Sequence, residues 1–150
     1  MESKLGTYAL IMRSESNAEF QVGKWGRIAI VPGYYIYVGS AFGPGGVRAR
    51  ILRHCRVSKP KHWHIDYLSD FVNPISAWYS YEQKKLEHKW AQVFSEMSET
   101  TPIKGFGCSD CNCYTHLFAT SAKPDLERFP VAVGGGIKTW LYLTSCRQNS

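Results

Sequence analysis

Several side chains of this sequence are of the kinds that act on phosphate esters. Tyr8 and Tyr37 carry phenols, Arg50 a guanidinium, His54 an imidazole and Glu87 a carboxylate. Attack on a phosphodiester needs cationic help beside a group that activates water, because the diester is shielded by its own negative charge. A phenol, with an ordinary pKa of about 10, can activate water only where a metal ion or an arginine lowers that pKa. Residue types alone do not name a reaction, but phosphodiester chemistry would use this set, provided that the fold brings them together.

The first half of the chain must supply strands that hold the two tyrosines. The segment 6–12, which is rich in apolar residues, predicts a buried strand. Two short strands are predicted at 20–22 and 27–31, joined by a turn at 23–26. Aromatic and β-branched residues at 34–38 predict a further strand. A glycine-rich loop at 39–46 then leads into 47–56, where the apolar spacing predicts a helix. Arg50 and His54 are four residues apart on that helix, so both fall on one face.

The second half of the chain is predicted to be mostly helical, with strands at its end. Helices are expected at 63–72 and 82–97, the second ending before Thr101-Pro102, with a strand at 75–81 between them. A loop occupies 105–116, and short strands follow at 117–120 and 140–144. This order predicts a single α+β domain over 1–150, in which a small antiparallel or mixed β-sheet is flanked by helices. The length suffices for one sizeable core.

The charge of the chain favours an anionic partner. Its 18 Lys and Arg outnumber 12 Asp and Glu, giving a formal charge of +6, which suits a polyanion such as nucleic acid. No segment approaches the roughly 20 apolar residues of a membrane span. The five cysteines are odd in number and three are crowded together, which favours a reducing, intracellular (cytoplasmic) location over a disulfide framework. Basic residues gather between positions 48 and 61 with no acidic residue among them: Arg48, Arg50, Arg53, Arg56, Lys59 and Lys61.

Four short strings resemble a known family. GTY at 6–8 and YVGS at 37–40 are similar to the two halves of the GIY-YIG nuclease signature, and Arg50 and His54 follow in its Arg-x-x-x-His spacing. Within that superfamily the chain most resembles the Uri-type, or domain-of-unknown-function 123, branch. The strings that carry this resemblance are GYYIYVGSA (33–41), RILRH (50–54), WHIDYL (63–68), and FGCSDC (106–111) with HLF (116–118). They span roughly residues 5–120 in the family's order.

The resemblance implies a metal-dependent endonuclease that hydrolyses phosphodiester bonds of nucleic acid, with DNA as the expected partner. In this assignment Glu87 binds one Mg or Mn ion and Arg50 clamps the phosphate. Tyr8 and Tyr37 orient or activate water, and His54 is an acid/base or positioning group. Residues 5–120 form the core, 121–146 a C-terminal extension with a strand, and 20–30 an extra hairpin between the two signature strands. Contacts to the substrate are expected from Ser40, Arg48, Arg53 and Lys61.

The sequence departs from the family pattern at three places. The signature halves are GTY and YVG, which keep both tyrosines. The asparagine that the wider superfamily often carries after the last helix has no clear match, although Ser109 or Asp110 could take its place. Glu82 competes with Glu87 as the metal ligand, and the spacing to Trp90 favours Glu87.

Other residues allow two interpretations. His64 could act on the substrate or as an acid/base group, or the segment at 63–66 could only begin a helix, with Trp63 packed and Asp66 compensating the helix dipole. His88 is expected to face solvent. Four soft ligands, Cys108, Cys111, Cys113 and His116, could bind zinc, but their spacing favours a loop of free thiols that flanks the active site.

Two other functions remain open on the sequence alone. The protein could be a nucleic-acid-binding module that keeps the fold without the chemistry, or a zinc-stabilised interaction domain. The sequence leaves open the oligomeric state, the choice between single-stranded and duplex substrates, and the choice between DNA and RNA.

Overall fold

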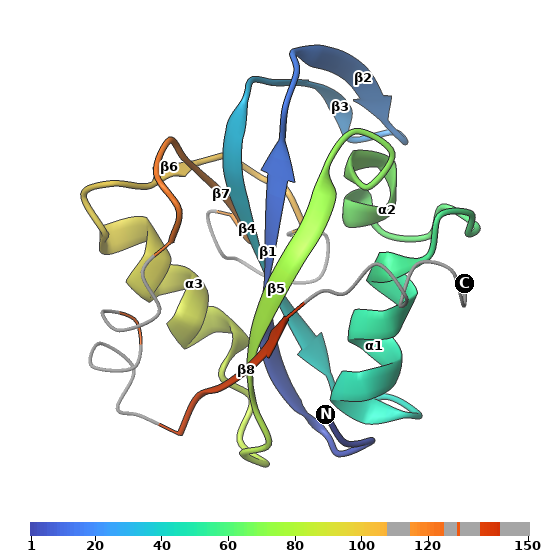
Figure 1. Cartoon of the computed structure of the whole chain (residues 1–150), viewed down its shortest axis with the longest axis vertical. Helices are drawn as coiled ribbons and strands as arrows, with labels where there is room; N and C mark the ends of the chain where they lie inside the picture. The colour runs from blue at the N-terminus through green and yellow to red at the C-terminus, as the bar shows by residue number, and fades with distance from the viewer. Residues whose placement is uncertain (108–114, 125–128, 130–135, 142–150) are drawn as a thin grey trace.

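The structure is a computed structural model and describes residues 1–107, 115–124, 129 and 136–141 (Figure 1). Its main sheet has six antiparallel strands in the order β6-β7-β4-β1-β5-β8, and β2 and β3 form a separate two-stranded sheet. The α+β class is confirmed, and the sheet is antiparallel. The strands are β1 (Gly6–Ser14), β2 (Ala18–Val22), β3 (Gly26–Ile30), β4 (Gly33–Ala41), β5 (Asn73–Ser80), β6 (Thr101–Pro102), β7 (Leu117–Thr120) and β8 (Lys138–Leu141). The helices are α1 (Gly46–Cys55), α2 (His64–Leu68) and α3 (Glu87–Glu96).

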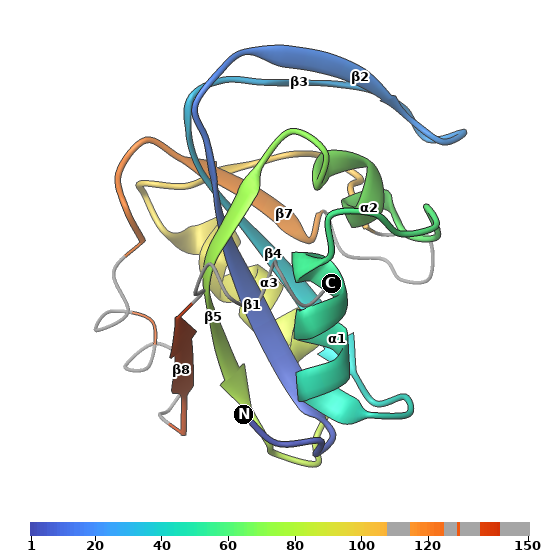
Figure 2. The same cartoon turned by 45° about the vertical axis from the view of Figure 1, so that its right-hand side comes forward.

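Both faces of the main sheet are covered by helices. Figures 1 and 2 show α1 and α2 on one side of β1 and α3 on the other. Leu10 belongs to the core that includes Val47 of α1, whereas its neighbour Ile11 belongs to the core that includes Trp90 of α3. Successive residues of a strand point to opposite faces. Covering both faces therefore explains why β1 is an almost continuous apolar run rather than an alternating one.

The register of β1 and β4 places the two tyrosines on one face of the sheet. Tyr8 pairs with Gly39, and Leu10 pairs with Tyr37. Because residues two apart on a strand share a face, Tyr8, Leu10 and Tyr37 all point toward α1. The two halves of the tyrosine-glycine signature are therefore adjacent in space.

The hairpin expected between these two strands is present. β2 and β3 pair in register from Ala18–Ile30 to Val22–Gly26, and the hairpin extends away from the main sheet (Figure 2). Its base is held by apolar packing, with the ring of Phe20 stacked 4.1 Å from that of Phe71. Gly23 adopts a φ of 47° at the turn, a conformation that glycine allows at no steric cost.

Several element boundaries differ from the sequence predictions. The helix predicted at 63–72 is only the five-residue α2: the chain turns after Leu68, where the backbone N–H of Phe71 donates to the carbonyl of Leu68, and enters β5 at Asn73. The helix predicted at 82–97 begins only at Glu87, since the backbone N–H of Leu86 donates to Thr7 Oγ1 on β1. No helix in the described part of the chain is both long and apolar enough to cross a membrane.

Two strands near the end of the chain also differ. Thr101 and Pro102, expected only to terminate a helix, form β6 and pair with β7. The strand predicted at 140–144 is observed as Lys138–Leu141, and residues 142–144 lie outside the described part.

Candidate active site

One cleft of about 510 Å³ brings together side chains from distant parts of the sequence. Its walls come from β1, β4, α1, α2, the start of α3 and the residues just before β7. Six of the residues predicted for the site line it: Tyr8, Tyr37, Ser40, Arg50, His64 and Glu87. Six further lining residues were given no catalytic or substrate-binding role by the sequence: His62, Trp63, Lys85, His88, Gly107 and His116.

Tyr8 and Tyr37 form the deep part of the cleft. Their side chains are 1% and 9% exposed, and the ring centroids are 6.5 Å apart. The ring of Tyr8 lies directly over Gly39, where a Cβ atom would come within 2.3 Å of the phenol. The glycine of the second signature half is therefore required by the close approach of Tyr8 to β4.

The hydroxyl of Tyr8 contacts the buried imidazole of His54. The hydroxyl oxygen lies 2.7 Å from His54 Nε2, and His54 is 3% exposed and does not line the cleft. Burial lowers the pKa of His54 to about 3, so the imidazole is neutral at neutral pH. Among the described residues, its Nδ1 has no hydrogen-bond partner. Of the two roles predicted for His54, this geometry favours positioning of Tyr8 over proton transfer with a substrate.

The pKa of Tyr8 differs from the sequence expectation. Burial of the phenol and the neighbouring Tyr37 raise the pKa of Tyr8 well above its ordinary value. Arg50 is near enough to lower the pKa, as expected, but its effect is outweighed. Tyr8 is therefore a protonated hydrogen-bonding group and not a phenolate in this state.

Arg50 and Arg53, one turn apart on α1, have different surroundings. Both guanidinium groups lie 4.4 Å from the ring of Trp63. Arg50 lines the cleft, whereas Arg53 donates two hydrogen bonds, of 2.7 and 3.0 Å, to the carboxylate of Asp66. Burial alone would raise the pKa of Asp66, but the bonds from Arg53 and from the backbone of Trp63 and His62 lower it. The Arg53–Asp66 pair thus links α1 to α2, whereas the guanidinium of Arg50 lines the cleft and is placed to bind a ligand there.

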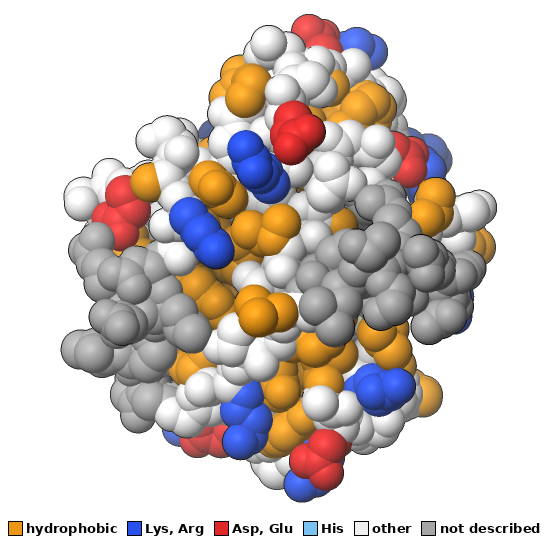
Figure 3. Space-filling model, in the orientation of Figure 1, with side chains coloured by type: hydrophobic (Ala, Val, Ile, Leu, Met, Phe, Trp, Pro, Cys, Tyr) orange, Lys and Arg blue, Asp and Glu red, His pale blue; other side chains and the backbone are white. Residues whose placement is uncertain are grey.

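The other cations predicted to contact substrate lie outside the cleft. Lys61 forms an ion pair with Asp70 at 2.8 Å, and the guanidinium of Arg48 lies 3.5 Å from the carbonyl oxygen of Met1. On the face shown in Figure 3, Lys and Arg side chains are scattered and do not form one continuous patch. Only Arg50 and Lys85 contribute a full positive charge to the cleft among the described residues.

Glu87 is the first residue of α3 and lines the cleft. One of its oxygens, Oε1, lies 2.7 Å from Nδ1 of His116, which is 1% exposed. Its rival Glu82 is exposed, precedes the helix and does not line the cleft. Of the two glutamates, only Glu87 is therefore placed to hold a cation beside Arg50 and the tyrosines.

His64 lines the same cleft on the side of α2. The backbone N–H of Gly107 donates to His64 Nδ1 at 2.9 Å, so the proton of the neutral imidazole is on Nε2. Burial lowers the pKa of His64, which favours this neutral form. The structural interpretation of the segment also holds, because Asp66 accepts the backbone N–H of Trp63 at 2.8 Å. Asp66 thus has a structural role, and His64 is available to a ligand.

The possible zinc ligands can be located only in part. Cys108, Cys111 and Cys113 lie outside the described residues, and His116 directs Nδ1 toward Glu87. Elsewhere, no three His, Cys, Asp or Glu side chains of the described residues are grouped so as to hold a metal ion. The zinc set stays a prediction.

The lining residues that the sequence did not assign share one property. Trp63 and His116 fall in the strings WHIDYL and HLF that carry the family resemblance, but neither these strings nor periodicity indicates that their side chains, or that of Lys85, line the cleft. His88 is exposed, as expected, but it also lines the cleft, with its ring 6.1 Å from that of His116. The available local signal was adjacency, since Lys85 and His88 flank Glu87.

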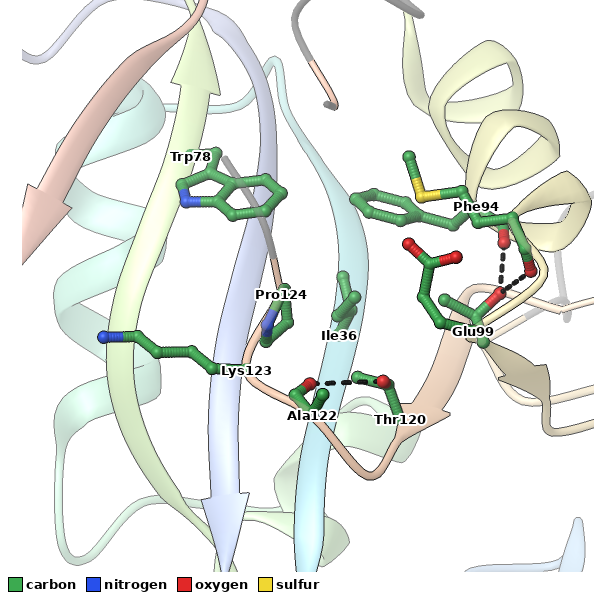
Figure 4. A pocket seen from close by; sticks show the side chains of 10 residues that line it. Ile36, Trp78, Phe94, Glu99, Thr120, Ala122, Lys123 and Pro124 are labelled. Atoms are coloured by element: carbon green, nitrogen blue, oxygen red, sulfur yellow. Dashed lines mark hydrogen bonds between the residues drawn. The ribbon is translucent and has the colours of Figure 1, made fainter. Parts of the chain in front are cut away.

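A second cavity of about 200 Å³ lies on the α3 side of the sheet (Figure 4). Trp78, Phe94 and Ile36 give it a largely apolar lining. Its charged residues, Lys123 and Glu99, are exposed on the rim. The described residues that line it do not include the combination of phenol, guanidinium and carboxylate that the first cleft contains.

Comparison with known proteins assigns most of this chain to one family model. The model described as "Domain of unknown function DUF123" matches residues 7–135. That range includes every residue that lines the cleft, from Tyr8 to His116. Neither the curated proteins nor the solved structures contain a match to the chain.

Proposed function

The chain belongs to the DUF123 family, and on this premise we propose that it is a metal-dependent endonuclease of the GIY-YIG type that hydrolyses phosphodiester bonds of nucleic acid. One observation carries the proposal. The cleft of about 510 Å³ places the two signature tyrosines, Arg50 and Glu87 around one space. The pairing of Tyr8 with Gly39 on adjacent strands supports the assignment to this superfamily.

The cleft suits a phosphate group next to Arg50. A guanidinium offers a planar pair of donors that matches the oxygens of a phosphate. Trp63, 4.4 Å away, lies against this guanidinium and restricts its orientation. Lys85 adds a second positive charge on the side of the cleft where α3 begins. These two cations would bind the scissile phosphate and a neighbouring one.

The donor set suits a magnesium or manganese ion. Mg²⁺ prefers oxygen ligands, keeps several of its waters and is commonly held by one or two carboxylates together with substrate phosphate. Glu87 supplies one carboxylate, whose Oε1 lies 2.7 Å from His116 Nδ1. With Oε1 engaged in this way, Glu87 would hold the ion through its other oxygen, Oε2. When bound, the ion would polarise the phosphate and stabilise the leaving oxygen.

The tyrosines would position the attacking water in this mechanism. Because the pKa of Tyr8 is raised, its hydroxyl acts as a neutral donor and acceptor whose orientation is set by His54. Tyr37 provides a second hydroxyl at the floor of the cleft. His64, with its proton on Nε2, can donate a hydrogen bond to a substrate oxygen. DNA as the substrate and an intracellular location are part of the same proposal.

Cleavage of defined oligonucleotides tests the proposal. Single-stranded and duplex DNA and RNA of one sequence would be incubated with the protein in Mg²⁺, in Mn²⁺ or in EDTA. We expect cleavage with either metal and none in EDTA. Arg50→Gln should lower the rate about 10²–10³-fold, whereas Arg13→Gln, at an exposed position outside the cleft, should leave it unchanged. Binding of every substrate without cleavage of any would instead support a non-catalytic binding module.

A further inference from the structure

A histidine and a glutamate from distant parts of the chain meet at the cleft. Glu87 begins α3, and His116 comes just before β7. His116 Nδ1 lies 2.7 Å from Glu87 Oε1. His116 is 1% exposed, whereas the side chain of Glu87 is 24% exposed. A fixed imidazole thus contacts one oxygen of a carboxylate that reaches the cleft.

The imidazole of His116 is anchored by the backbone around it. Its own N–H donates to the carbonyl of Phe106, and its own carbonyl accepts from the N–H of Val38, both at 2.9 Å. Gly107 packs against the side chain, where a Cβ atom would lie 3.2 Å from that of His116. The position of His116 is therefore set in part by β4 and by Phe106 and Gly107, independently of its contact with Glu87 on α3.

The partners of Nδ1 determine where the proton of this ring lies. Besides Glu87 Oε1, the carbonyl oxygen of Val38 lies 3.2 Å from Nδ1. Both partners are oxygens that can only accept, so Nδ1 carries a hydrogen and donates. The contact therefore holds for both the neutral and the charged imidazole.

We propose that His116 is a positioning residue for Glu87: it fixes Oε1 and so aims Oε2 at a divalent cation in the cleft. This inference rests on the proposed role of Glu87 as the metal ligand. A carboxylate on the first turn of a helix can adopt several rotamers, and a hydrogen bond to one oxygen selects among them. Ligating carboxylates commonly have such partners, and loss of one costs about 10–100-fold in metal affinity or activity.

A purely structural pair is the competing explanation. A buried imidazole needs a hydrogen-bond partner whether or not the protein binds metal. The two explanations predict different effects when the donor is moved by one bond. Asparagine places its amide nitrogen near the position of Nδ1, whereas glutamine, one methylene longer, carries it past that position. A structural role requires only a polar side chain that folds, but a positioning role requires the donor at the place of Nδ1.

Manganese affinity of the metal-free protein provides the test, measured by the electron paramagnetic resonance signal of free Mn²⁺. We expect His116→Gln to bind Mn²⁺ about 10–100-fold more weakly than the wild type. His116→Asn should stay within about threefold of the wild type, since the donor is retained. Glu87→Gln should lose the binding altogether. Thermal unfolding without metal would show that each variant is folded.

The outcomes separate this inference from the proposed function. If Glu87→Gln loses Mn²⁺ binding but His116→Gln and His116→Asn both bind as the wild type does, the positioning role is overturned and the metal site stands. If Glu87→Gln binds Mn²⁺ as tightly as the wild type, or the wild type binds none, the assignment of Glu87 is overturned together with the role of His116. If His116→Gln fails to fold, the Mn²⁺ affinity of His116→Asn provides the test. A folded His116→Asn variant that binds Mn²⁺ 10-fold or more weakly than the wild type contradicts the inference.

Discussion

Acidification is expected to destabilise the protein through His54. The pKa of this buried imidazole is lowered from 6.5 to about 3 in the folded state, while in the unfolded chain it returns to its ordinary value. Between these values the unfolded state binds more protons than the native state. The stability that the neutral imidazole confers is therefore complete above pH 6.5 and is lost as the pH falls toward 3. At about 1.4 kcal/mol for each pH unit, two units of acidification to pH 4.5 should cost about 3 kcal/mol.

Urea unfolding of the wild type and of His54→Gln measures this cost. The variant keeps a polar partner for the Tyr8 hydroxyl but has no group that titrates, and all other titrating groups are common to both proteins. We expect the free energy of unfolding of the wild type to fall by about 3 kcal/mol relative to the variant between pH 7 and pH 4.5. Two curves that run parallel over this range would refute the inference that His54 is buried and neutral behind Tyr8.

The cleft leads to two further predictions. A Cβ atom at Gly39 would come within 2.3 Å of the Tyr8 ring, so Gly39→Ala should cost about 1–3 kcal/mol in the free energy of unfolding; an unchanged urea midpoint would contradict this close packing. Because only Arg50 and Lys85 bring full positive charge to the cleft among the described residues, log K for a single strand should change with log salt concentration with a slope of about −1.4. A slope near −3.5, measured by fluorescence anisotropy, would mean that Arg48, Arg53 and Lys61 bind phosphate as well.

The sequence predicted the strands well because their burial is recorded in local composition. The apolar run at 6–12 lies in β1, which is covered on both faces, and the aromatic residues at 34–38 lie in β4. Helix ends were predicted less well, because tertiary contacts set them. The hydrogen bond from Leu86 to Thr7 delays the start of α3, and α2 ends in a turn in which the backbone N–H of Phe71 donates to the carbonyl of Leu68. Neither contact could be inferred from periodicity.

The candidate site, like the fold, could be predicted from the sequence only in part. The motif residues Tyr8, Tyr37, Arg50 and Glu87 could be chosen from the sequence, because the resemblance supplied their order and spacing. His54, which contacts Tyr8, could be chosen in the same way. The contacts of Glu87 with His116 and of Arg50 with Trp63 could not, because each joins different elements of the fold.

The charge of a side chain gives no indication of such pairing. Arg50 and Arg53 look equivalent in the sequence, but only Arg50 lines the cleft. The sequence predicts a buried strand at 6–12, but not that burial of Tyr8 outweighs the nearby arginine and leaves the phenol protonated.

The most direct test of the central claim is the Mg²⁺-dependent cleavage rate of three glutamate variants on one oligonucleotide. Glu87→Gln keeps the size and polarity of the side chain but removes the charge that would hold the ion, so its rate should fall at least 10²-fold. Glu96→Gln, exposed at the far end of the same helix, should cleave like the wild type. Glu82→Gln should cleave like the wild type as well, because Glu82 is exposed and outside the cleft. A wild-type cleavage rate for Glu87→Gln, or a loss of cleavage in Glu82→Gln, would contradict the assignment of Glu87 as the metal ligand.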